Sequence, residues 1–204
     1  MNNLKDLGTV PFDLSILQSF YPDCKHITDK ARRLEAEGTI VRLKKGLYVA
    51  NTKDGTLSYE LIANHLYGPS YVSMSWALSH YGLIPERVYL VQSITTKHSR
   101  KFSNALGTFH YQNCANDYFP LGISTQGQEK THYLIASPEK ALCDYICYNK
   151  VTLRFRKDVE IFLEEDLRFD TDIIPDLNLE IIRQCAESGR KLNSLSTLYK
   201  FLKK

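Results

Sequence analysis

The stretch that most constrains the fold is residues 24–50, CKHITDKARRLEAEGTIVRLKKGLYVA, because a helical pattern runs directly into a hairpin pattern. Ile27, Ala31 and Leu34 recur at the spacing of one helical face, so we expect an amphipathic helix whose apolar side is packed. Gly38 follows the last periodic residue, and glycine readily adopts the positive φ that closes a helix. The helix is therefore expected to end at this glycine.

A basic β-hairpin is predicted immediately after the glycine. Residues 39–43 and 47–49 have the composition of strands, and residues 44–46 form the turn between them. A helix with a cationic outer face followed by a basic hairpin is typical of a winged helix-turn-helix, whose second helix enters a major groove while its wing lies along phosphates. We therefore predict a winged helix-turn-helix DNA-binding domain in residues 1–51.

Positive charge is concentrated in this segment. Residues 25–45 carry seven Lys or Arg and three Asp or Glu, a net charge of +4, whereas the whole chain of 204 residues has a formal net charge of only +3. Phosphate binding requires such a local excess. In the alternative interpretation, the helix and hairpin only pack on a neighbouring domain, because charged faces are usually just solvated.

The expected DNA-binding residues fall into three groups. Those expected to face the major groove project away from the apolar side of the helix: Lys25, Thr28, Arg32 and Arg33. Those expected to neutralise phosphates lie on the wing: Arg42, Lys44 and Lys45. His26 and Lys30 flank the groove-facing group and are expected to reach the DNA backbone.

The bulk properties are those of a soluble protein. A chain of 204 residues suits one large domain or two small ones, and its 24% charged residues are ordinary for a soluble chain. No apolar run approaches the roughly 18 residues of a membrane span, and the first residues lack a signal-peptide pattern. The five scattered cysteines favour reduced thiols over a disulfide framework. We expect a cytoplasmic protein without membrane contact.

A second domain is predicted in residues 52–204, after the turn-rich sequence NTKDGT at 51–56. Its sheet core is expected at about 57–150, with a helical tail at 151–204. Within the core, helices are predicted at 57–66 and 73–81, strands at 88–95, 108–112, 118–124 and 131–136, and a further helix starting at Ser137. The overall fold class is therefore α+β, with a mostly antiparallel sheet in the second domain.

A polar, cationic turn, TTKHSRK at 95–101, is predicted between two strands. Its basic side chains could form a second contact with nucleic acid or an acidic partner: Lys97, His98, Arg100 and Lys101. The simpler alternative is an ordinary solvated hairpin tip.

The other potentially reactive residues are better explained by structural roles than by catalysis or metal binding. Cys143 and Cys147 lie one helical turn apart, but no second ligand pair accompanies them, so they are expected to be core thiols. Glu139 and Lys140 have the wrong spacing for a metal-dependent nuclease and belong to a helix start. Glycine-rich phosphate loops and the common nucleophile motifs are missing. We expect no catalytic residue, no metal and no cofactor.

Four stretches, in this order and spacing, resemble the AbiEi family, the antitoxins of type IV (abortive-infection) toxin–antitoxin pairs. They are ARRLEAEGTIVRLKKGLYVA at 31–50, YGPSYVSMSWALSHYGLIPE at 67–86, VYLVQSITTKHSRKFSNALGTFHY at 88–111 and ASPEKALCDYI at 136–146. The resemblance implies that the N-terminal domain binds double-stranded operator DNA and represses its own operon. It also implies that residues 52–204 form the antitoxin domain, which counters a cognate nucleotidyltransferase-like toxin without requiring a stable complex.

Two further hypotheses belong to other classes of function. One is a winged-helix protein fused to a nuclease-like or nucleotide-modifying enzymatic domain, with Glu139 or Asp144 as the carboxylates to test. The other is an interaction module, with the hairpin at 95–101 and the C-terminal helices as its partner surface. The sequence lacks a credible carboxylate–lysine cluster, so the first hypothesis is a non-enzymatic repressor and antitoxin.

Overall fold

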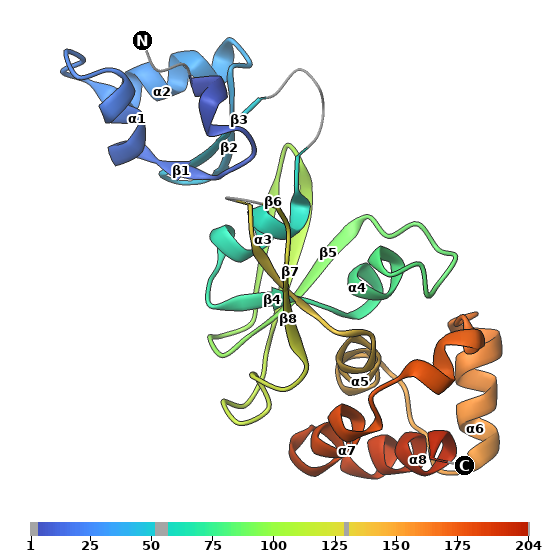
Figure 1. Ribbon diagram of the computed structural model, residues 1–204. Coiled ribbons are helices and arrows are strands. Elements are labelled where there is room, and N and C mark those ends of the chain that lie inside the picture. Colours follow the sequence, from blue (N-terminus) through green and yellow to red (C-terminus); the bar gives the residue numbers. More distant parts are fainter. Residues whose placement is uncertain (1–3, 52–56, 129–130, 204) are drawn as a thin grey trace.

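The computed structural model describes residues 4–51, 57–128 and 131–203, which fold as α+β. Figure 1 shows an N-terminal unit (residues 4–51) next to a larger unit (residues 57–203). The predicted boundary falls on residues 52–56, outside the described residues. The N-terminal unit contains, in order, η1 (Leu4–Leu7), β1 (Phe12–Asp13), α1 (Leu14–Phe20), α2 (Ile27–Ala36), β2 (Ile40–Lys44) and β3 (Leu47–Ala50).

The N-terminal unit has a small core of its own. Ala31 and Leu34 on α2 are buried against Leu17 of α1 and Ile40 and Tyr48 of the hairpin, as the helical periodicity predicts. The strands form an antiparallel sheet in the order β1-β3-β2, so β2 is an edge strand. Packing of the inner face of α2 leaves its other side free to face solvent.

The end of α2 is closed at the predicted glycine. The amide of Thr39 donates to the carbonyl of Leu34 at 2.8 Å, and the amide of Gly38 donates to the carbonyl of Glu35 at 3.0 Å. Gly38 has a φ of +69°, the left-handed conformation that these two bonds require. The chain therefore turns directly from α2 into β2.

The larger unit is a six-stranded sheet with helices packed on it and a helical C-terminal part. Its elements are α3 (Tyr59–Leu66), β4 (Ser70–Val72), α4 (Met74–His80), β5 (Leu90–Thr95), β6 (Arg100–Asn104), β7 (Gly107–Asn113), β8 (Ile123–Gln126), β9 (Tyr133–Ala136), α5 (Pro138–Tyr148), α6 (Arg156–Ile161), the π-helical turn η2 (Phe162–Asp166), η3 (Thr171–Asp176), α7 (Leu179–Ser188) and α8 (Leu192–Leu202). None of these helices is long and apolar enough to span a bilayer.

The sheet is more mixed than expected. Its strand order is β6-β7-β5-β4-β9-β8, and the pairs β5/β7 and β4/β9 are parallel while the other three are antiparallel. The parallel pairs join strands that are not consecutive in the chain, which short-range patterns cannot reveal. β6 is an edge strand, and Figure 1 shows it on the side that meets the N-terminal unit, with α6, α7 and α8 at the opposite end.

Two local predictions in the larger unit are wrong. Residues 118–124 are predicted as a strand, but residues 116–122 form a turn and β8 begins only at Ile123. Gly122 has a φ of +57°, which a strand does not adopt. The polar turn at 95–101 is shorter than expected, because β6 already begins at Arg100; charged side chains are common on such an edge strand.

A fully buried ion pair joins two residues of α5. Lys140 and Asp144, one helical turn apart, are both inaccessible to solvent, and Nζ lies 3.6 Å from Oδ1. The Asp144 carboxylate also accepts hydrogen bonds from Ser73 Oγ at 2.6 Å and Tyr118 Oη at 2.7 Å. Lys140 Nζ donates to the carbonyl of Tyr118 at 2.9 Å. The pair thus joins α5 to the β4–α4 junction and to the 116–122 turn.

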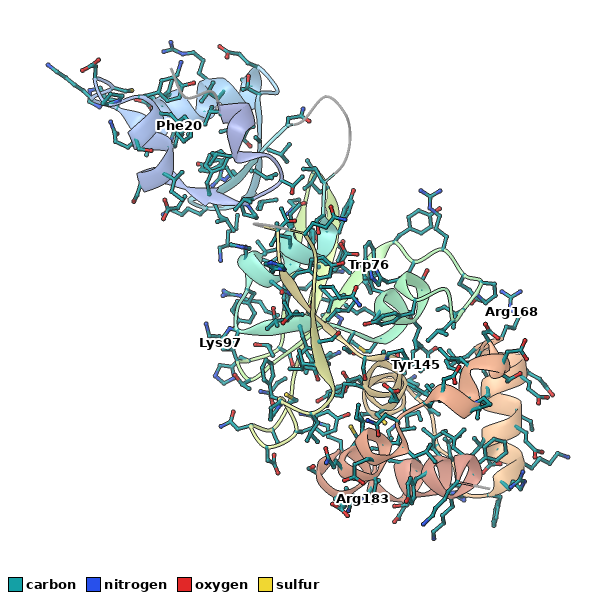
Figure 2. All side chains as sticks on the ribbon, in the orientation of Figure 1. Phe20, Trp76, Lys97, Tyr145, Arg168 and Arg183 are labelled. Carbon is teal, nitrogen blue, oxygen red and sulfur yellow. The ribbon has the colours of Figure 1, made fainter. Side chains whose placement is uncertain are left out.

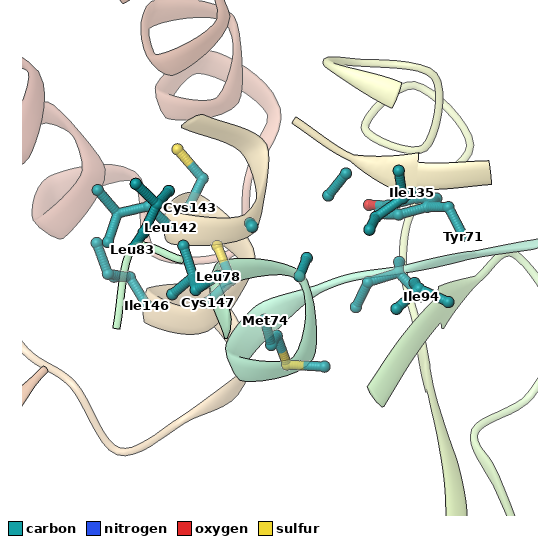
Figure 3. Packing of buried hydrophobic residues seen from close by; sticks show 14 of the residues in the cluster. Tyr71, Met74, Leu78, Leu83, Ile94, Ile135, Leu142, Cys143, Ile146 and Cys147 are labelled. Carbon is teal, nitrogen blue, oxygen red and sulfur yellow. The ribbon is translucent and has the colours of Figure 1, made fainter. Parts of the chain in front are cut away.

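Much of the remaining buried surface of α5 is apolar. Figure 3 shows Cys143 and Cys147 within this packing, beside Leu78 and Ile146. Both thiols are buried and free, as predicted from the sequence. The buried polar pair is therefore surrounded by core side chains.

We predict that Asp144→Asn lowers the free energy of unfolding by about 3–5 kcal/mol, because it leaves the buried Lys140 ammonium without a counter-charge while conserving volume. Urea denaturation measures this loss. The control is Glu160→Gln, which breaks the exposed Arg156–Glu160 pair, whose side chains are 54% and 44% accessible; it should cost less than about 1 kcal/mol. Equal losses for both variants would contradict a structural role of the buried pair.

Candidate nucleic-acid interface

The predicted groove-facing residues lie on the surface, three on the outer face of α2 and Lys25 just before its N-cap. Lys25, Thr28, Arg32 and Arg33 are all exposed. Arg32 Nη1 lies 3.3 Å from Asp29 Oδ1, but the two side chains are 81% and 61% accessible. An ion pair so exposed to water contributes little, so it does not hold the guanidinium away from a ligand.

The flanking residues occupy different environments. His26 is the exposed N-cap residue of α2 and makes no side-chain capping bond. Lys30 is half-buried, and its Nζ lies 4.6 Å from the centre of the Tyr21 ring, beyond the end of α1. A cation over an aromatic face is held in place by about 0.5–1 kcal/mol at such sites. Lys30 therefore supports the α1–α2 junction and lies beside the exposed face.

The predicted wing residues do not all point the same way. Arg42 and Lys45 are exposed, whereas Lys44 is half-buried and its Nζ donates to the carbonyl of Leu66 at 2.5 Å. Leu66 is the last residue of α3, and cations are favoured at the negative end of a helix. The strand register shifts between Arg42 and Lys44. The structure thus directs Lys44 towards the larger unit, apart from the other wing cations.

The predicted second basic group lies on the larger unit and is exposed: Lys97, His98, Arg100 and Lys101. Lys97, labelled in Figure 2, donates from Nζ to the carbonyl of Gly68, and Nζ lies 5.5 Å from the centre of the Tyr67 ring. The guanidinium of Arg100 lies 5.8 Å from the same ring and 5.5 Å from that of Phe102. Two of the four cations therefore share one aromatic surface.

The structure brings parts of both predicted groups together. Lys44 Nζ lies 6.0 Å from the centre of the Phe102 ring, on the surface shared by Lys97 and Arg100. Burial, followed by the positive charges of Lys97 and Arg100, lowers the pKa of Lys44 below its usual value. We call these three cations with Tyr67 and Phe102 the seam cluster. The ion pairs found among residues 4–51, 57–128 and 131–203 include none of its three cations.

The two units also meet directly beside this cluster. Asn104 Nδ2 donates to the carbonyl of Leu43 at 3.1 Å, so the edge strands β6 and β2 are connected. An open groove of about 520 Å³ lies between these strands, and the side chains of Arg42, Lys44 and Lys45 line its N-terminal side. Leu43 and Val49 are buried in the core of the larger unit. The hairpin thus packs on its neighbour, as the alternative interpretation expects, while the outer face of α2 does not.

The carboxylates considered for catalysis lie in the interior. Glu139 is buried, and its Oε1 accepts the amide of Asn178 at 2.8 Å, at the start of α7. Asp144 is held by the buried pair described above. Sequence reasoning missed the partners Ser73 and Tyr118; the only local signal was a lysine and an aspartate four residues apart within an apolar helix. Within the described ranges, no three His, Cys, Asp or Glu side chains are grouped to hold a metal ion.

We predict that Lys44 titrates below the usual lysine pKa of 10.5, because burial and two neighbouring cations disfavour its charged form. Between its folded pKa and the usual value of 10.5, the unfolded chain binds more protons at this site, so the contribution of Lys44 to stability rises with pH. NMR titration of the lysine side chains, with the Lys44 signal assigned by Lys44→Gln, measures its midpoint. A Lys44 midpoint at or above 10.5 would contradict the seam geometry.

Comparisons with known proteins assign the chain to no family. No protein-family model matches the chain, and no curated protein matches it significantly. Its function must therefore be inferred from the geometry and charge of the candidate interface, since a fold alone does not specify a function.

Proposed function

We propose that this chain is a cytoplasmic DNA-binding autorepressor and the antitoxin of a type IV toxin–antitoxin pair. The observation that carries the DNA-binding half is the division of α2 into a packed inner face and an exposed outer face that bears Arg32 and Arg33, with the exposed Lys25 just before the helix. The order of elements in residues 4–51, a short helix, a strand, two helices and a hairpin, supports a winged helix-turn-helix.

The dimensions of α2 suit a major groove. The 10-residue α2 is, like any α-helix with its side chains, about 10–12 Å across, and the major groove of B-DNA is about 12 Å wide. Thr28 and Arg32 lie four residues apart and so share one helical face. Arginine reads guanine through two hydrogen bonds, and the threonine methyl group contacts thymine. Arg32 is therefore the proposed base-reading residue, and Lys25 and Arg33 lie beside it.

Backbone contacts are proposed for the exposed part of the wing. Arg42 and Lys45 extend from β2 and its turn into solvent, where they can neutralise phosphates without leaving a protein partner. Lys44 is assigned differently, because its ammonium faces α3.

The antitoxin half rests on the family resemblance. Three of the four resembling segments form β4, α4, β5, β6, β7 and α5, which pack together in the larger unit. The proposed functional partner is a nucleotidyltransferase-like toxin, which the larger unit counters with or without a direct complex. No observation specifically favours the enzymatic alternative, since Glu139 and Asp144 are both enclosed in the core.

We predict that Arg32→Ala weakens binding to the chain's own operator by about 1–3 kcal/mol, the usual effect of losing one good base contact, and weakens binding to random duplex much less. Arg32→Lys should also lose specificity, because lysine keeps the charge but not the two-pronged geometry. Fluorescence anisotropy with both duplexes measures the two affinities.

The matched control is Arg156→Ala on α6, an exposed arginine at the far end of the larger unit. It should leave both affinities unchanged. Equal losses on operator and random DNA for Arg32→Ala would remove its base-reading role.

We predict that co-expression of this chain restores the growth of cells that express the nucleotidyltransferase-like protein encoded beside it. Arg32→Ala should rescue equally well, because the antitoxin activity is assigned to the larger unit. Colony counts at matched expression measure the effect. Failure of both chains to rescue would contradict the antitoxin half of the proposal and leave DNA binding unaffected.

A further inference from the structure

We propose that the seam cluster binds a backbone phosphate of duplex DNA, so that one phosphate is held by cations from both units. This inference rests on the proposed DNA-binding function and extends the DNA contact beyond α2. Lys44 comes from β2 of the N-terminal unit, and Lys97 and Arg100 come from the β5–β6 region of the larger unit.

The cations of the cluster have spare hydrogen-bonding capacity. Lys44 and Lys97 each donate one hydrogen bond to a main-chain carbonyl at the end of α3, and an ammonium group has three donors. In the part of the chain that the structure describes, the side chain of Arg100 donates no hydrogen bond, although a guanidinium has five donors. A phosphate oxygen is an acceptor that all three groups could share.

The aromatic surface beneath the cations is fixed to the core. Tyr67 and Phe102 lie 5.7 Å apart between ring centres, and both contact the edge of the buried Tyr111 ring, at 5.3 and 5.7 Å. Tyr111 Oη donates to the carbonyl of Ala63 at 2.7 Å. Tyr67 Oη donates to the carbonyl of His98 at 3.3 Å. The cations are thus held over anchored rings, which reduces the entropy lost when they bind a ligand.

Electrostatic repulsion within the cluster favours an anion. Burial lowers the pKa of Lys44 most, and the nearby positive charges of Lys97 and Arg100 lower it further. A bound phosphate would relieve this repulsion and raise that pKa again, because an opposite charge favours the protonated form. The open groove between β2 and β6, which Lys44 also lines, gives a polyanion access to the cluster.

A shared phosphate would also fix the orientation of α2. The direct hydrogen bond between Asn104 and Leu43 already connects β6 to β2. A phosphate held by Lys44, Lys97 and Arg100 would add a second connection that exists only when DNA is bound. Recognition by α2 and docking of the larger unit would then be coupled.

The test uses the full chain and the double variant Lys97→Gln/Arg100→Gln. Binding to operator and random duplexes is measured from low to moderate salt. Two cations that share one phosphate with Lys44 should reduce the slope of log affinity against log salt by about one unit on both duplexes. The control, Arg156→Gln/Lys157→Gln on α6, removes the same charge from exposed positions and should leave the slope unchanged. Thermal unfolding verifies that both variants fold.

A second readout measures the pKa of Lys44 itself. NMR titration with inorganic phosphate, and separately with a duplex of about 30 base pairs, should raise the Lys44 pKa in the parent chain and the α6 control but not in the seam variant. An unchanged salt slope in the seam variant, or a Lys44 pKa that does not change when duplex DNA is added, would overturn the seam proposal. If the chain still prefers its operator in that case, the proposed function is unaffected. A chain without operator preference whose Lys44 still responds to inorganic phosphate would overturn the proposed function and keep the anion site.

Discussion

The buried pair of Lys140 and Asp144 is the contact on which the larger unit depends. Two charges without access to water are tolerated only when each is neutralised and hydrogen-bonded, and here Ser73 and Tyr118 supply those bonds. These partners come from separate parts of the chain, so the pair is complete only when all of them are in place. The adjoining Met74 has a positive φ of 54°, an unfavourable conformation for a residue with a side chain. The surrounding packing holds this strained junction in place.

The seam is built outward from this core. α5 packs on the sheet, the sheet carries Tyr111, and Tyr111 anchors both α3 and the ring of Tyr67. α3 in turn ends at the carbonyl that receives Lys44. The N-terminal unit thus contacts two features of the larger unit, the end of α3 and the aromatic ring of Phe102. The exposed side of α2 makes none of these contacts, and for this reason it is available to a ligand.

Much of the local structure was predictable from the sequence. Gly38 ends α2 and Ser137 begins α5, because each of these signals acts over a few residues. The α+β class follows from the same signals. The winged helix-turn-helix assignment and the roles of the basic residues remain proposals based on pattern and placement.

The long-range arrangement was not predictable. The parallel pairs join strands that are not consecutive in the chain, and the sequence of β6 resembles a loop because an edge strand needs few apolar residues. The direction of Lys44 depends on a register shift and on the end of α3, neither of which local composition specifies. Tyr118 is predicted in a strand because its neighbours have the composition of a strand. In the structure it lies in the 116–122 turn, where its hydroxyl donates a hydrogen bond to Asp144.

The proposed function requires that this chain prefer a particular DNA sequence. Competition binding of the full chain, at an ionic strength of about 0.15 M, between the duplex upstream of its own coding sequence and a scrambled duplex of the same composition tests it most directly. We expect a preference of about 10³-fold or more for the native duplex. Equal affinity for the two duplexes would contradict it.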